Sequence, residues 1–126
     1  MSKLIFIVDN SSSMRRVMEI ALTGAGYEVM EAADGRDALT KLAKLSGKRI
    51  SLIVCTAVMP GMGGLELIEA LKKESIYKFT PAVLLVTENS EAVQERARAV
   101  GNVKATIVKP FNPTQLITTV QKVALP

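Results

Sequence analysis

Short apolar runs alternate with segments of helical period along the whole chain. Five runs have the length and aliphatic character of buried strands, at 4–8, 28–32, 50–55, 82–87 and 105–108. Between and after these runs, apolar residues recur at the three- and four-residue spacing of a helix face, and the last such segment is 113–123. Strands that are apolar throughout are typical of parallel sheets covered on both faces. The pattern therefore predicts an α/β fold of five βα units, a parallel sheet with helices on both sides.

Cap and turn residues mark the ends of these helices. Ser11 offers an N-cap hydroxyl to the first helix, and Ser90 offers one to the fourth. Gly26, Gly47 and Gly101 follow the first, second and fourth helices, where glycine commonly ends a helix. The chain contains no internal repeat and no linker long enough to divide it, so we expect one domain over residues 1–126.

Composition and charge exclude several classes of protein. The content of 48% hydrophobic and 22% charged residues is that of an ordinary soluble chain, and no apolar run reaches the roughly 20 residues of a membrane span. The formal charge is +4, but basic residues such as Arg15 and Arg16 are spread along the predicted helices, which favours solvated helix faces over a nucleic-acid interface. The single cysteine, Cys55, cannot form an internal disulfide. We expect a cytoplasmic protein with no membrane or direct nucleic-acid partner.

Polar residues follow four of the five predicted strands at the point where each strand ends. Asp9 and Asn10 follow the first strand, Thr56 the third, Thr87 the fourth and Lys109 the fifth. Taken singly, each has an ordinary explanation as a cap, a strand-end hydroxyl or a solvated lysine. Because the carboxyl ends of parallel strands meet at one edge, where such sheets bind ligands, their joint position predicts a functional site.

Five motifs occur in order along nearly the whole chain: "IVDNSSSMR", "AADGRDAL", "VMPGMGGLELI", "PAVLLVTE" and "IVKPF". With these motifs the sequence resembles the receiver domains of bacterial two-component response regulators, of the CheY type. The resemblance implies a flavodoxin-like, CheY-like sheet with strand order 2-1-3-4-5, for which CheY is a standard example. It also implies a role in phosphorelay signal transduction.

The resemblance assigns a role to each residue at the sheet edge. In the family, two adjacent acids and an aspartate ending the third strand hold Mg²⁺. That aspartate accepts a phosphoryl group from a sensor kinase, and a hydroxyl and a lysine then hold the phosphoryl oxygens. Carried across, the first acid is Asp9, the hydroxyl is Thr87 and the lysine is Lys109. The second acid position holds Asn10, and the phosphoacceptor position holds Thr56, which implies an atypical member, a pseudo-receiver.

These departures predict a pocket that neither binds Mg²⁺ well nor accepts a phosphoryl group. Asp9 and Lys109 nearly cancel in charge, so we expect a direct ion pair between them and weak or lost Mg²⁺ binding, with no cofactor. A threonine hydroxyl needs a general base to act as a nucleophile, and the chain has no histidine. We therefore predict that aspartyl phosphorylation is lost and that the chain is not an enzyme. Thr106 stands where the family has an aromatic switch residue, and the segment 101–109 is about one residue longer than the family pattern.

The resemblance also implies protein partners, a signalling protein or a sensor kinase. The family's usual partner surface, formed by the fourth helix, fifth strand and fifth helix, maps to 92–123. Candidates for exposed apolar contacts on it are Val100, Val103, Ile117 and Val120.

Other functions stay open at this point. One is a receiver that accepts phosphate on an unusual residue: Asp9 is the acid left in the pocket, and Asp34 and Glu88 lie in rim loops. Another is phosphorylation of Thr56 by a Ser/Thr kinase. A third is a small-molecule binder of flavodoxin type, which would use the serines at the start of the first helix.

Overall fold

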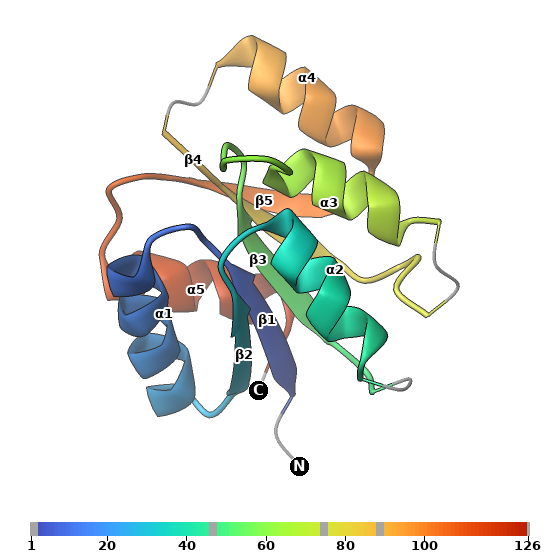
Figure 1. Ribbon diagram of the computed structural model, residues 1–126. Helices are drawn as coiled ribbons and strands as arrows, with labels where there is room; N and C mark the ends of the chain where they lie inside the picture. The colour runs from blue at the N-terminus through green and yellow to red at the C-terminus, as the bar shows by residue number, and fades with distance from the viewer. Residues whose placement is uncertain (1–2, 46–47, 74–75, 88–89, 126) are drawn as a thin grey trace.

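The sheet has the predicted topology. The computed structural model describes residues 3–45, 48–73, 76–87 and 90–125. Within these ranges five parallel strands lie in the order β2-β1-β3-β4-β5 (Figure 1), which confirms the order that the resemblance implied. The strands are β1 (Leu4–Val8), β2 (Glu28–Ala32), β3 (Leu52–Thr56), β4 (Ala82–Val86) and β5 (Val103–Val108).

The helices cover both faces of the sheet. Helices α1 and α5 lie together on one face, and α2, α3 and α4 lie on the other (Figure 1). Their bounds are α1 (Ser12–Gly24), α2 (Gly35–Ala43), α3 (Gly64–Leu71), α4 (Glu91–Val100) and α5 (Pro113–Val123). None of the helices in the described ranges is long and apolar enough to cross a membrane.

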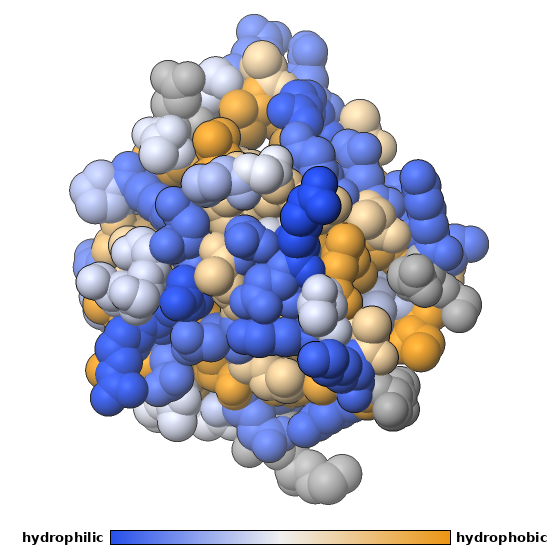
Figure 2. All heavy atoms as spheres, viewed as in Figure 1, coloured by the Kyte–Doolittle hydropathy of each residue, from blue (hydrophilic) through white to orange (hydrophobic). Residues whose placement is uncertain are grey.

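Alternate strand residues feed two separate cores. In β1, Ile5 and Ile7 pack under α1 and α5, whereas Phe6 and Val8 pack under α2, α3 and α4. This two-sided burial explains why the three central strands, β1, β3 and β4, are buried along their whole length and almost entirely apolar. The outer strands β2 and β5 are partly exposed and include charged residues. Cys55 lies in the second of these cores, and burial raises the pKa of its thiol to about 12, so the thiol stays protonated. On the face seen in Figure 2, hydrophilic residues separate the apolar ones into small patches.

The predicted caps are present where the structure describes them. The Ser11 side chain accepts a hydrogen bond from the Met14 backbone N–H, and Ser90 accepts one from Val93. Gly101 ends α4 with φ 87°, a left-handed conformation that glycine adopts without steric cost. Gly47 lies outside the described residues.

Four strand ends differ from the predicted positions. β3 begins at Leu52 and extends to Thr56, and β4 ends at Val86. β5 begins at Val103 rather than at residue 105. The charged Lys104 interrupts the apolar pattern there, but Val103 already pairs with Ala82, and the next pair is Val83 with Ala105. β5 therefore carries an extra residue, Lys104, as a bulge in the ladder.

Two of the four predicted surface contacts are wrong. Val100 is 5% exposed and Val120 is fully buried, because each lies on the inward stripe of its helix, with Ala97 and Leu116 respectively. Val103 and Ile117 are half-buried.

Candidate functional site

The site lies at the carboxyl edge of the sheet, where β1, β3 and β5 end. Asp9 directly follows β1, Thr56 is the last residue of β3, and Lys109 directly follows β5. The ladders place them at one edge: Val8 pairs with Cys55, and the Lys109 backbone N–H donates to the Val86 carbonyl. The peptide bond between Lys109 and Pro110 is cis.

Asp9 is the centre of the site, and its carboxylate is fully buried. Lys109 Nζ lies 2.8 Å from Asp9 Oδ2, which confirms the expected ion pair. The Thr56 hydroxyl donates to the same oxygen over 2.5 Å, and the Ser11 backbone N–H donates to Asp9 Oδ1 over 2.8 Å. Both carboxylate oxygens are therefore satisfied by donors of the protein itself.

These donors keep Asp9 ionised. Burial raises the pKa of the Asp9 carboxyl, but hydrogen bonds from Lys109, Thr56 and the Ser11 N–H, with the charge of Lys109, outweigh burial and hold the pKa below its ordinary value. The buried negative charge is matched by the ammonium of Lys109, whose side chain is 19% exposed. The pair is thus close to neutral as a unit.

The other predicted site residues lie outside this hydrogen-bonded group. Asn10 and Thr87 follow their strands as predicted, and both are exposed. Thr106 is half-buried in β5 opposite Leu84, on the sheet face covered by α2, α3 and α4. Asp34 caps α2, where its side chain accepts from the Asp37 backbone N–H over 2.8 Å. Glu88 lies outside the described residues.

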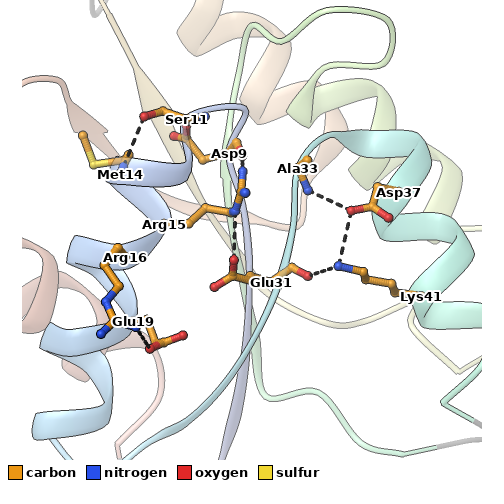
Figure 3. Close-up of polar contacts among 10 residues, drawn as sticks. All are labelled: Asp9, Ser11, Met14, Arg15, Arg16, Glu19, Glu31, Ala33, Asp37 and Lys41. Carbon is orange, nitrogen blue, oxygen red and sulfur yellow. Dashed lines mark hydrogen bonds and ion pairs between the residues drawn. The ribbon is translucent and has the colours of Figure 1, made fainter.

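Arg15 belongs to the rim of the site, and sequence reasoning missed it. The expectation of a solvated side chain holds for Arg16 but is wrong for Arg15, whose side chain is 16% exposed. Arg15 Nη1 donates to the Asp9 backbone carbonyl over 2.6 Å, and its Nε lies 3.0 Å from Glu31 Oε1 (Figure 3). A signal was present: Glu31 lies between the apolar residues Met30 and Ala32 in a predicted strand, and a partly buried carboxylate needs a cationic partner nearby.

A second set of polar contacts holds α2 to β2 (Figure 3). Lys41 Nζ donates to the Glu31 backbone carbonyl over 2.8 Å and lies 3.4 Å from Asp37 Oδ2. Asp37 also accepts from the Ala33 backbone N–H over 2.9 Å. That hydrogen bond is the main cause of a lowered Asp37 pKa, and it acts against the opposing effect of burial.

The described part of the chain contains no group of three or more His, Cys, Asp or Glu side chains placed to hold a metal ion. Asp9 is the one carboxylate in the hydrogen-bonded group.

β1 and β5 bring a buried aspartate and a lysine together at the carboxyl edge of a 2-1-3-4-5 sheet, as the resemblance to receiver domains implied. The chain belongs to the response regulator receiver domain family, which it matches over residues 5–121. It is 35% identical to chemotaxis protein CheY1 of Helicobacter pylori over 113 residues, which are 89% of each chain. A CheY homologue of Campylobacter jejuni is also 35% identical, over 89% of this chain and 85% of that protein.

Solved structures agree with these relatives. The chemotaxis protein CheY4 of Vibrio cholerae superposes with a TM-score of 0.90 at 41% identity, over 98% of this chain and all of that one. A putative response regulator from Chloroflexus aurantiacus superposes with a TM-score of 0.86 at 26% identity. The chain is therefore a receiver domain of the kind found in two-component and chemotaxis signalling.

Proposed function

We propose that this chain is an atypical receiver, a pseudo-receiver that signals through protein contacts without phosphorylation of an aspartate. The observation that carries the proposal is the arrangement around Asp9. Its two oxygens accept hydrogen bonds from Ser11, Thr56 and Lys109, and Thr56 stands where the family resemblance places the phosphoacceptor. Hydrogen-bond donors of the protein itself thus occupy both oxygens of the Asp9 carboxylate.

The donor set fits Mg²⁺ poorly. Mg²⁺ sites in proteins use one or two carboxylates with substrate phosphate oxygens and several waters. Here an incoming cation would meet an amide at Asn10 and a hydroxyl at Thr56, and it would have to displace Lys109 from Asp9 Oδ2. A divalent ion would also face the positive charge of Lys109, which the single carboxylate of Asp9 already balances.

Thr56 is a poor replacement for the aspartate as a nucleophile. Its hydroxyl proton points at Asp9 Oδ2, so Asp9 is the group that would have to act as general base. The same contacts that lower the pKa of Asp9 make it a weak base. Thr56 is also 5% exposed, which restricts the approach of a kinase to its hydroxyl.

We further propose that output passes through the surface of α4, β5 and α5 to a signalling protein or a sensor kinase. Val103 and Ile117 are the two residues of the predicted apolar set that retain exposed surface there. Thr106 has no aromatic ring that could change position when the pocket is phosphorylated. This surface would therefore keep one conformation and be available to a partner at all times.

The test is to incubate the chain with Mg²⁺ and acetyl phosphate, followed by intact mass and tandem mass spectrometry. We expect no phosphoryl group on any residue. The matched control is the double variant Asn10→Asp/Thr56→Asp, which supplies both missing carboxylates and should become labelled. Stoichiometric labelling of the unaltered chain, on Asp9 or elsewhere, would overturn the proposal, as would pocket shifts in the NMR spectrum with beryllofluoride.

A further inference from the structure

A groove lies at the opposite edge of the sheet from Asp9. It runs between the start of β5, the second half of α5 and the segment that leads into β4, and its volume is about 530 Å³. The site around Asp9 is at the carboxyl ends of the strands, whereas this groove is at their amino ends. Its lining residues are Phe79, Pro81, Lys104, Ala105, Thr119, Lys122 and Val123.

The groove contains an unusually exposed aromatic side chain. Phe79 is 83% exposed, more than any other large hydrophobic side chain among the described residues. Pro81, Ala105 and Val123 are the other apolar residues that line the groove. The ring of Phe79 contributes nothing to either core and would lose water contact only against a partner.

The charged residues that line the groove are both cationic. Lys104 and Lys122 line it, and both are exposed. Lys78 Nζ lies 5.5 Å from the centroid of the Phe79 ring, which adds a third positive charge at the rim. None of the described lining residues is acidic.

The bulge in β5 is what places one of these charges. Val103 pairs with Ala82 and Ala105 pairs with Val83, so Lys104 is the extra residue of the ladder. A bulge changes the direction in which a side chain leaves a strand, and here the redirected side chain reaches the groove.

We propose that this groove binds an acidic segment of a partner protein, with an aliphatic or aromatic side chain against Phe79 and carboxylates facing Lys104 and Lys122. Charge complementarity selects an acidic occupant. A single exposed ring with lysines around it is a weak platform for a nucleic acid, which needs several aromatic residues to stack successive bases. The proposal rests on the proposed function, because the partner is a protein and because five of the seven lining residues belong to β5 and α5, which form part of the proposed output surface.

The experiment is a peptide-display selection on the immobilised full chain, followed by measurement of the affinity of recovered peptides by fluorescence anisotropy. We expect peptides with Asp and Glu on either side of Leu or Phe. Phe79→Ala and the double variant Lys104→Glu/Lys122→Glu should each weaken binding about tenfold or more. Lys44→Glu is the matched control, since Lys44 is an exposed lysine on the far side of the sheet, beside α2, and its reversal should leave the affinity unchanged.

Several results would overturn the proposal. They are recovery of no peptides, recovery of peptides without acidic residues, or equal affinity for all the variants. Amide shifts at Lys104, Ala105 and Thr119 that respond to a single-stranded oligonucleotide more strongly than to the peptides would assign the groove to nucleic acid instead. These measurements use no phosphate donor, so their outcome is independent of the acetyl phosphate test. Peptide binding can fail in a chain that is not phosphorylated, and it can succeed in a chain that is.

Discussion

The Thr56 hydroxyl and the Lys109 ammonium share one acceptor, Asp9 Oδ2, at 2.5 and 2.8 Å. The acceptor is fully buried, so neither donor can be replaced freely by water. One donor is neutral and the other carries the balancing charge. Removal of each should therefore affect stability to a different extent.

Thr56→Val removes the hydroxyl and keeps the shape of the side chain. Asp9 would keep Lys109 and the Ser11 N–H but lose one donor in a buried position, so the free energy of unfolding should fall by about 1 to 3 kcal/mol. Urea denaturation measures this change. Thr87→Val is the matched control on an exposed strand end and should change stability by no more than about 0.5 kcal/mol. Equal effects of the two substitutions would contradict the role given to the Thr56 hydroxyl.

Lys109→Met removes the charge that balances Asp9. A buried carboxylate without its cation is strongly unfavourable, and the free energy of unfolding should fall by about 3 to 5 kcal/mol. Adding Asp9→Asn to this variant removes the unbalanced charge and should recover most of the loss. A double-mutant cycle by urea denaturation gives the coupling, and additive losses would show that the two groups do not interact.

The low pKa of Asp9 predicts how stability depends on pH. The folded pKa lies below the ordinary value of 3.8, so the unfolded chain takes up protons first as the pH falls. The stabilisation from Asp9 is therefore complete above about pH 5 and is lost as the pH falls through the folded pKa. Urea denaturation at a series of acidic pH values should give a shallower decline for Asp9→Asn than for the unaltered chain. Some decline should remain, because the pKa of Asp37 is lowered too.

The fold could be predicted from the sequence because its three central strands are almost entirely apolar, a pattern that a buried parallel sheet requires. The same topology brings Asp9, Thr56 and Lys109 together, since parallel strands end at one edge. The burial of Val120 could not be predicted, because the sequence pattern alone does not determine which side of α5 faces the sheet.

The groove beside α5 could not be predicted for a related reason. It depends on the bulge at Lys104 and on the path of the segment that carries Phe79, and both are set by tertiary packing rather than by local pattern. The contacts of Arg15 are a similar case. They join α1 to the end of β1 and to β2, and these elements come together only in the folded structure.

Arg15→Lys should destabilise the rim of the site. The guanidinium contacts the Asp9 carbonyl through Nη1 and Glu31 through Nε, and a lysine ammonium cannot reproduce that pair of directions. We expect a loss of about 1 to 2 kcal/mol in the free energy of unfolding. Arg16→Lys is the control: Arg16 contacts Glu19 on the exposed surface, where such a pair contributes little. If the two variants are equally stable, the Arg15 contacts are not significant in solution.

Mg²⁺ should raise the thermal stability of a variant with the two missing carboxylates restored, but not that of the unaltered chain. In Asn10→Asp/Thr56→Asp, two added acids would join Asp9 against the single charge of Lys109, and their repulsion should lower the melting temperature in the absence of metal. Mg²⁺ would neutralise them, and at about a hundredfold excess over its Kd it should stabilise the folded variant by about 2.7 kcal/mol. Thermal denaturation with MgCl₂, with NaCl of equal ionic strength and with a chelator separates binding from screening. The unaltered chain should respond alike to both salts, and a specific gain with MgCl₂ would show that Asp9 and Asn10 hold the metal despite Lys109.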